Sequence, residues 1–291
     1  ISTGMFASVT FPSSLLTMTA GNMFGYDIDV LDGSDRLAVS APFLNGGVVY
    51  IYNREGYTFE LIQIIDAFTL EKGVTKSYTN DNYYLQDGDM LGYSLSLKTN
   101  HLLISCPGDD NGSSNVGSIY HFTLYSDYSS ANPYSLLQVI VPPTIINNER
   151  FGVRVDLNTN EDIMTVTAAG GNSIIDTTFD SHSDRSTVDG GYVLDKTSEA
   201  ITGTTFDSES TTFYDSIPYT GAVYVYNRFD NNFIYADKLV PLDSLYTGDN
   251  FGSSLSVSDD SIVVGAPTKE YNGKDVGIAY VFDYNELSWK I

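Results

Sequence analysis

Hydrophobic and polar residues alternate, or run in short blocks of strand length, in a pattern that recurs four times along the chain. One segment of each copy alternates polar and apolar side chains, as in residues 26–30 and 254–257. Such alternation predicts a strand with two unlike faces. The next segment, as in residues 262–264, is apolar throughout and predicts a strand that is buried on both faces. No stretch shows the 3.6-residue period of an amphipathic helix, so the pattern predicts an all-β chain.

Each copy continues with two further predicted strands. The third segment is aromatic and β-branched, as in residues 47–52 and 277–282, and such side chains suit a pleated surface. Dipeptides typical of tight turns, including Asp32-Gly33 and Asn272-Gly273, separate the segments. The fourth segment is less regular and covers residues 57–65, 134–140, 233–239 and 288–291. We therefore expect each copy to be an antiparallel unit of four strands.

Each copy starts at an apolar residue followed by glycine, and the spacing of the starts reveals one insertion. The starts are Phe24, Leu91, Phe151 and Phe251, which lie 67, 60 and 100 residues apart. In the third copy 52 residues separate the second segment from the third, against 10 in the second and fourth copies. Removing the excess of 42 residues shortens the longest interval from 100 to 58. The insertion lies within residues 171–220.

A four-stranded antiparallel unit that repeats every 60 residues or so is typical of a β-propeller blade. One such unit cannot bury both of its faces, so neighbouring units are expected to cover each other. The aromatic ring is expected to fill the space between blades, and the glycine to let two backbones approach closely. The predicted repeat core is Phe24, Gly25, Leu91, Gly92, Phe151, Gly152, Phe251 and Gly252.

These apolar-glycine pairs are each followed by a corner of small residues. The four combinations are Phe24-Gly25 with Ala41-Pro42, Leu91-Gly92 with Cys106-Pro107, Phe151-Gly152 with Ala168-Ala169-Gly170, and Phe251-Gly252 with Gly265-Ala266-Pro267. At these residues the chain resembles the FG-GAP repeat propellers, the family that includes the N-terminal domain of integrin α subunits. The first and fourth combinations resemble the family most clearly.

The resemblance implies a ring of seven blades, which four repeats do not fill. Residues 1–291 are expected to form a single β-propeller domain or a segment of one, and residues 171–220 could hold a degenerate fifth blade. Residues 14–18 look like a fourth strand without its blade, and the chain stops inside another fourth strand. Either the two ends share a closing blade or the chain is part of a larger ring, and we favour the second alternative.

The charge balance excludes several classes of partner. The chain has 14 Lys and Arg residues against 37 Asp and Glu residues, which gives a net charge of −23. A field of that sign repels nucleic acids and anionic lipid headgroups. No apolar run approaches the length of a membrane span, so direct membrane insertion is not expected. The single cysteine, Cys106, excludes an internal disulfide and is expected to be a buried packing residue.

Calcium is the one cofactor that the resemblance suggests, because many members of the family carry a loop of alternating Asp and Asn between strands one and two. Here Asp156, Asn158, Asn160 and Asp162 alternate in this way. They lack the central glycine and the closing carboxylate of a calcium loop. The expectation is therefore no cofactor, with calcium at these four residues as the alternative.

No arrangement of residues indicates catalysis. Nucleophilic catalysis requires a Ser or Cys beside a base that a third group orients. The three histidines are His101, in a turn, His121, on a strand, and His182, in the insertion, and none belongs to such a pattern. We therefore expect that the chain is not an enzyme.

The insertions point to a binding face. In an up-and-down blade, connections 2–3 and 4–1 lie on one face, and the two longest connections, within residues 171–220 and 66–89, are of these kinds. Long loops on a rigid scaffold are where binding concentrates. Their aromatic residues, which suit protein or glycan contacts, are Tyr78, Tyr83, Tyr84, Phe206, Phe213, Tyr214 and Tyr219.

The expected function is a non-enzymatic extracellular binding or adhesion module that recognises a protein or a glycan through this face. The alternative is a structural subunit of a virion, fibre or surface assembly, whose neighbours would be its partners. A polysaccharide-active enzyme is a third hypothesis, which a cluster of acids with a basic partner at the ring axis would favour. The expected location is extracellular, at a cell surface or on a viral particle.

Overall fold

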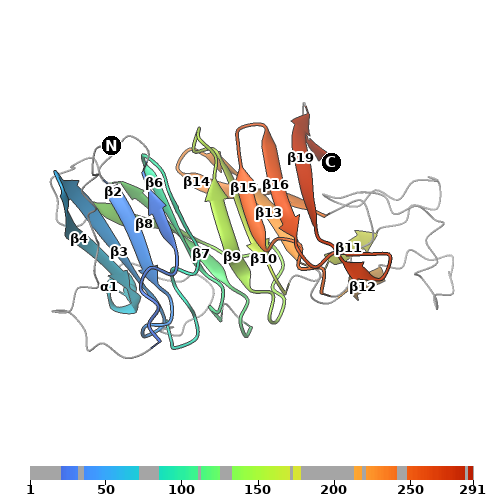
Figure 1. Ribbon diagram of the computed structural model, residues 1–291, viewed down its shortest axis with the longest axis horizontal. Helices are drawn as coiled ribbons and strands as arrows, with labels where there is room; N and C mark the ends of the chain where they lie inside the picture. The colour runs from blue at the N-terminus through green and yellow to red at the C-terminus, as the bar shows by residue number, and fades with distance from the viewer. Residues whose placement is uncertain are drawn as a thin grey trace, which may run out of the picture.

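Four antiparallel sheets of four strands each lie side by side in chain order (Figure 1). The computed structural model describes residues 21–31, 36–71, 85–110, 113–124, 133–170, 173–177, 213–217, 221–240, 248–285 and 288–290. The prediction of an all-β chain built from four-stranded antiparallel units is confirmed. One five-residue helix, α1 (Ala67–Glu71), follows the first sheet.

The strands follow one another across each sheet in the order of the chain, apart from the inserted elements. Sheet I contains β1 (Ile28–Val30), β2 (Arg36–Ala41), β3 (Val48–Glu55) and β4 (Thr58–Asp66). Sheet II contains β5 (Leu95–Leu97), β6 (His101–Cys106), β7 (Ser118–Leu124) and β8 (Tyr134–Ile140). Sheet III contains β9 (Phe151–Leu157), β10 (Ile163–Ala168), β13 (Ala222–Phe229) and β14 (Asn232–Leu239). Sheet IV contains β15 (Ser254–Val257), β16 (Ser261–Ala266), β19 (Ile278–Asn285) and β20 (Ser288–Lys290).

Two pairs of short strands lie within the connections between second and third strands. β11 (Ser173–Thr177) pairs with β12 (Phe213–Ile217) inside the long insertion. β17 (Glu270–Tyr271) pairs with β18 (Lys274–Asp275) in sheet IV's connection. The described part of the insertion is thus one two-stranded ladder, and the expectation of a degenerate fifth blade concerns residues outside the described part.

Sheets I and IV lie at opposite ends of the row, so the described residues form an open row rather than a closed ring (Figure 1). Three layers of apolar side chains fill the spaces between adjacent sheets. A fourth cluster, around Tyr50, lies on the face of sheet I that points away from sheet II. No helix in the described part of the chain has the length and apolar character needed to cross a membrane.

The apolar residues that start the repeats occupy equivalent positions. Leu91, Phe151 and Phe251 are buried in the layers between sheets I and II, II and III, and III and IV, respectively. The Phe151 ring meets Tyr224 edge-on at 5.6 Å between centroids, and Phe251 meets Tyr280 in the same way at 5.5 Å. Phe24 meets Tyr50 at 5.5 Å on the outer face of sheet I, where it is only half-buried. Edge-to-face rings therefore repeat along the row.

Conformation requires the glycine after each apolar residue, and space also requires it where a preceding sheet lies close. Gly92 has a φ of 88°, which is the left-handed region that L side chains rarely adopt. A Cβ placed on Gly92 would lie 2.8 Å from Ser40 Cβ and from Val49 Cγ2 of the preceding sheet. Gly25 has a similar φ of 86°, but nothing lies within 4 Å of its Cβ position, because no sheet precedes sheet I in the described part of the chain.

Glutamine side chains join the outermost strands of neighbouring sheets. Gln138 of β8 donates from Nε2 to Phe233 O of β14 at 3.0 Å and accepts from Phe233 N at 2.9 Å. Gln63 of β4 makes the same pair of bonds with the backbone of Tyr134 in β8, at 2.8 and 2.9 Å. Each amide thus replaces one rung of a backbone ladder where two sheet edges meet.

The prediction that every second strand is buried on both faces is wrong for sheet IV. All residues of β2 and β6 are buried. In β16, by contrast, Val263 is 40% exposed, and its neighbour Val281 in β19 is 47% exposed. Their counterparts in sheet III, Thr165 and Val225, are fully buried because sheet IV covers them. In the described part of the chain, no further sheet covers sheet IV.

Candidate binding site

The first strands of the four sheets, β1, β5, β9 and β15, lie beside one another along one side of the row. There, side chains of each strand bond to the next strand. Asp27 Oδ2 accepts from Leu95 N at 2.7 Å, and Asp29 Oδ2 accepts from Leu97 N at 2.6 Å. Asp156 Oδ2 accepts in the same way from Val257 N at 3.0 Å. These carboxylates satisfy backbone donors at the edge of the following sheet, which would otherwise lack a partner.

Serine hydroxyls continue this arrangement between sheets II and III. Ser94 Oγ accepts from Val155 N at 3.4 Å, and Ser96 Oγ accepts from Leu157 N at 3.2 Å. Partial burial raises the pKa values of Asp29 and Asp156, while the backbone bonds that they accept act in the opposite direction. The alternation that predicted a two-faced strand therefore reflects polar side chains that bind the next sheet.

A hollow of about 360 Å³ runs along these first strands. We call it the axial groove. Its walls combine carboxylates, two basic side chains and tyrosines. Its lining residues are Tyr26, Asp27, Ile28, Asp29, Tyr93, Ser94, Leu95, Lys98, Arg154, Val155, Asp156 and Leu255.

Three exposed or half-buried aromatic rings meet at one end of the axial groove, and we call them the aromatic patch. The Tyr26 ring lies 5.0 Å from Tyr93 and 5.5 Å from Phe43, measured between centroids. Phe43 lies in the connection between β2 and β3, and the tyrosines lie two residues before the starts of β1 and β5. The aromatic patch therefore lies at the edge of the row from which the 2–3 and 4–1 connections emerge. Burial and a hydrogen bond with Tyr93 raise the pKa of Tyr26 to about 12, so its hydroxyl is neutral at physiological pH.

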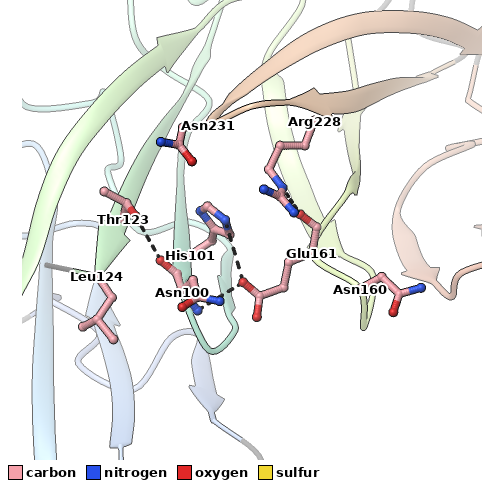
Figure 2. A pocket seen from close by; sticks show the side chains of 8 residues that line it. All are labelled: Asn100, His101, Thr123, Leu124, Asn160, Glu161, Arg228 and Asn231. Carbon is pink, nitrogen blue, oxygen red and sulfur yellow. Dashed lines mark hydrogen bonds and ion pairs between the residues drawn. The ribbon is translucent and has the colours of Figure 1, made fainter. Parts of the chain in front are cut away.

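A second hollow, of about 370 Å³, opens between sheets II and III at the opposite edge, among the short turns (Figure 2). Glu161 lies between His101 and Arg228 in this hollow (Figure 2). Its carboxylate accepts from Thr99 N at 3.0 Å and from Asn100 N at 3.1 Å, and so ties the β9–β10 turn to the β5–β6 turn. Arg228 Nε donates to the backbone oxygen of Glu161 at 2.6 Å.

Two buried histidines form the inner wall beside this second hollow. His101 Nδ1 lies 2.8 Å from His121 Nε2, and His101 Nε2 lies 3.8 Å from Glu161 Oε2. Burial, followed by the positive charges of His101 and Arg228, lowers the pKa of His121 to about 3. Burial also lowers the pKa of His101, which Glu161 partly offsets. The two rings thus contact each other and Glu161 where sheets II and III meet.

The four residues of the predicted calcium loop do not converge on one point. Asp156 faces the neighbouring first strands, whereas Asn158 Oδ1 accepts from Asp162 N at 2.9 Å and from Ile163 N at 2.8 Å. The amide nitrogen of Asn158 bonds Asp162 and Asp259, and Asn160 is exposed. Within the described ranges no group of three or more acidic, histidine or cysteine side chains is placed to hold a metal ion.

Most residues of the predicted ligand-binding loops lie outside the described part of the chain. Phe213 and Tyr214 fall on β12, whose backbone the structure describes. β11–β12 and α1 both lie in the lower half of the row in Figure 1, in agreement with connections that leave one edge. The remaining five predicted residues are Tyr78, Tyr83, Tyr84, Phe206 and Tyr219, all outside the described ranges. His182 is outside them as well.

The sequence interpretation missed the axial groove and the aromatic patch. It treated Tyr26 and Asp27 only as members of an alternating strand, and it found no acids with a basic partner at the axis. The signal was present as a tyrosine directly after the apolar-glycine pair, at Tyr26 and Tyr93, where the other two repeats have Val153 and Ser253.

Comparison with known proteins agrees with the repeat architecture. The family model described as FG-GAP repeat matches residues 236–282, so the chain contains an FG-GAP repeat at the position of its fourth sheet. No curated protein matches the chain. A solved structure from Bacteroides uniformis ATCC 8492, described as a "putative 6-phosphogluconolactonase", is 9% identical, covers 91% of this chain and 69% of its own, and has a TM-score of 0.36. That score is too low to carry an argument about fold or function.

Proposed function

We propose that the chain is a non-enzymatic binding module that works outside the cell and recognises its ligand through the edge that carries the long connections. The observation that supports this proposal most directly is the aromatic patch, whose rings are accessible at that edge. Exposed aromatic side chains next to polar groups are typical of recognition surfaces. The axial groove brings acids beside Lys98 and Arg154, which is the arrangement named for the enzyme hypothesis. Asp27, Asp29 and Asp156 each accept hydrogen bonds from the scaffold backbone, however, and this gives them a structural role.

A loop deletion tests the proposal. Thr177 and Phe213 are paired across the β11–β12 ladder, so a two-residue turn can replace residues 178–212 without separating the strands. The intact chain is expected to bind members of a glycan array or an array of cell-surface ectodomains. The shortened chain is expected to bind the same members with a changed affinity. Circular dichroism provides the control for an intact fold. If the intact chain bound on neither array, the proposal would be contradicted.

One observation favours the second candidate function, a structural subunit of a larger assembly. The outer face of sheet IV exposes Val263 and Val281, which pair with each other and form an apolar surface on a strongly charged protein. Light scattering separates the two functions, because an assembly subunit forms particles that grow with concentration. A binding module stays at one mass over the same range of concentration.

A further inference from the structure

We propose that the aromatic patch and the adjoining axial groove bind the ring of a neutral saccharide. This inference rests on the proposed function, since it names the class of ligand that the same edge takes. It concerns residues that all lie in the described part of the chain and that are separate from the insertion.

The aromatic rings offer a platform of suitable size and access. Tyr26 is 37% exposed and Phe43 is 44% exposed, although the two rings contact each other. One face of a pyranose ring carries only C–H groups, and it packs on an aromatic face with gain of both apolar contact and electrostatic attraction. The hollow of about 360 Å³ is at the lower end of the volumes of small-molecule sites, and is suited to one or two sugar rings.

The polar groups beside the rings suit hydroxyl groups, which both donate and accept. Each carboxylate oxygen of Asp27 accepts one backbone N–H, from Ile28 for Oδ1 and from Leu95 for Oδ2. A carboxylate oxygen has two lone pairs, so each retains acceptor capacity. Arg154 donates from one terminal nitrogen to Val153 O at 2.9 Å, and a guanidinium has five N–H groups in all. Acceptors and donors thus line the same groove beside the platform.

The mixture of charges argues against an ionic ligand. Asp27, Asp29 and Asp156 would repel an anion, and the net charge of −23 adds to that repulsion. Arg154 and Lys98 line the same groove and would repel the ammonium or guanidinium group of a basic peptide. A neutral, polyhydroxylated molecule is attracted to both kinds of group and repelled by neither.

The tyrosines are not needed by the scaffold. The equivalent residues after the apolar-glycine pair are Val153 in the third repeat and Ser253 in the fourth, and both of those sheets have the same strand order. Arg154 is likewise matched by Ser94 in the second repeat. Substitutions copied from the equivalent positions of the other repeats therefore remove the tyrosines or Arg154 and introduce side chains that the fold already accepts.

The test measures binding of four neutral tetrasaccharides, from cellulose, starch, mannan and chitin, by saturation-transfer NMR and calorimetry. At least one is expected to bind, with saturation transfer from the tyrosine rings. The double variant Y26S/Y93S should weaken its affinity at least about tenfold, and R154S should weaken it several-fold. Y57S is the matched control, because Tyr57 is 67% exposed in the turn between β3 and β4 at the opposite edge, and it should bind as the unaltered chain does.

Two results would overturn the saccharide site. One is the absence of saturation transfer from all four tetrasaccharides at about 10 mM, a concentration that detects even very weak binding. The other is equal affinity for the unaltered chain and Y26S/Y93S. Binding of tetralysine that depends on Tyr26, without saccharide binding, would identify a peptide site instead and would also overturn the proposal.

The two proposals fail separately. If array binding depends on residues 178–212 but not on Tyr26 and Tyr93, the proposed function stands and the saccharide site falls. If the chain binds on neither array but tetrasaccharides bind at the tyrosines, the saccharide site stands and the recognition of array ligands that the proposed function expects falls.

Discussion

A buried acid precedes each apolar-glycine pair inside the row by two residues, and each acid has a different partner. Asp89 accepts from Gln86 N at 2.7 Å, and Asp249 bonds Lys269 Nζ at 3.0 Å. Glu149 accepts a hydrogen bond from the Tyr224 hydroxyl. The Lys238 ammonium lies over the Tyr224 ring, at 5.2 Å from the ring centroid. Because these groups are buried where two sheets meet, their ionisation is linked to the stability of the interfaces.

Glu149 should make the protein less stable as the pH rises. Burial raises its pKa from 4.5 to about 7, while the bond from Tyr224 lowers it. A carboxyl group whose pKa is higher in the folded state stabilises the fold below its unfolded pKa, and this contribution is lost as the pH rises through about 7. E149Q should therefore gain in free energy of unfolding relative to the unaltered chain between pH 5 and pH 8, by up to about 3 kcal/mol. Urea unfolding at both values measures the gain, and equal pH dependence of the two proteins would contradict it.

The histidine pair should make the protein less stable as the pH falls, which is the opposite of the effect of Glu149. At 2.8 Å one of the two facing nitrogens must offer a lone pair, so both rings cannot be protonated while the contact persists. The pKa of His121 is lowered from 6.5 to about 3, so the unfolded chain takes up protons first and stability falls as the pH drops below 6.5. The groups that face the pair are Glu161 and Arg228.

The third repeat supplies the matched variant for this prediction. Ile163 and Val225 stand at the positions of His101 and His121, so H101I/H121V replaces the pair with residues that the same fold accommodates. Near pH 4.5 the variant should keep about 2 kcal/mol of stability that the unaltered chain loses relative to pH 7. Thermal unfolding across this range measures the difference, and parallel pH profiles would contradict the role of the histidines.

At the scale of strands and sheets, Gly25 and Gly92 distinguish the energetic cost of backbone strain from the cost of a steric clash between sheets. G92A should destabilise the fold by about 3 kcal/mol, because it adds steric overlap with Ser40 and Val49 to the strain of a positive φ. G25A carries the same strain without a neighbour and should cost only about 1 kcal/mol. Chemical denaturation of both variants measures the two terms, and equal losses would show that the approach of the sheets is irrelevant at Gly92.

The sequence predicted the strands and their grouping because both depend on local patterns. Alternation, turn dipeptides and the apolar-glycine pairs are all visible within a few residues, and they located the four sheets. The bonds from Asp27 to Leu95 and from Gln138 to Phe233 join residues 68 and 95 positions apart. Such bonds depend on how sheets stack, which no local pattern reports, and the axial groove exists only once that stacking is known.

At the scale of the whole molecule, the two ends of the row differ from its middle. Sheet IV has the same strand order as the inner sheets, but among the described residues nothing covers its outer face. A residue on that face and its counterpart inside the row should therefore respond very differently to a charge. V281K should change the free energy of unfolding by no more than about 0.5 kcal/mol.

The counterpart variant, V225K, places an unpaired charge in the layer between sheets III and IV and should prevent folding of that half of the row. Circular dichroism and urea titration compare the two variants. If V281K were as damaging as V225K, the outer face of sheet IV would have to be covered in solution.

The strand-by-strand linkage along the axial groove also has a mechanical consequence. Because most contacts between sheets join neighbours in the chain, tension applied to the two ends would pass through the interfaces in series. Among the described sheets, thermal fraying would begin at sheet I or sheet IV, each of which has one described interface with another sheet, and would travel inward one repeat at a time.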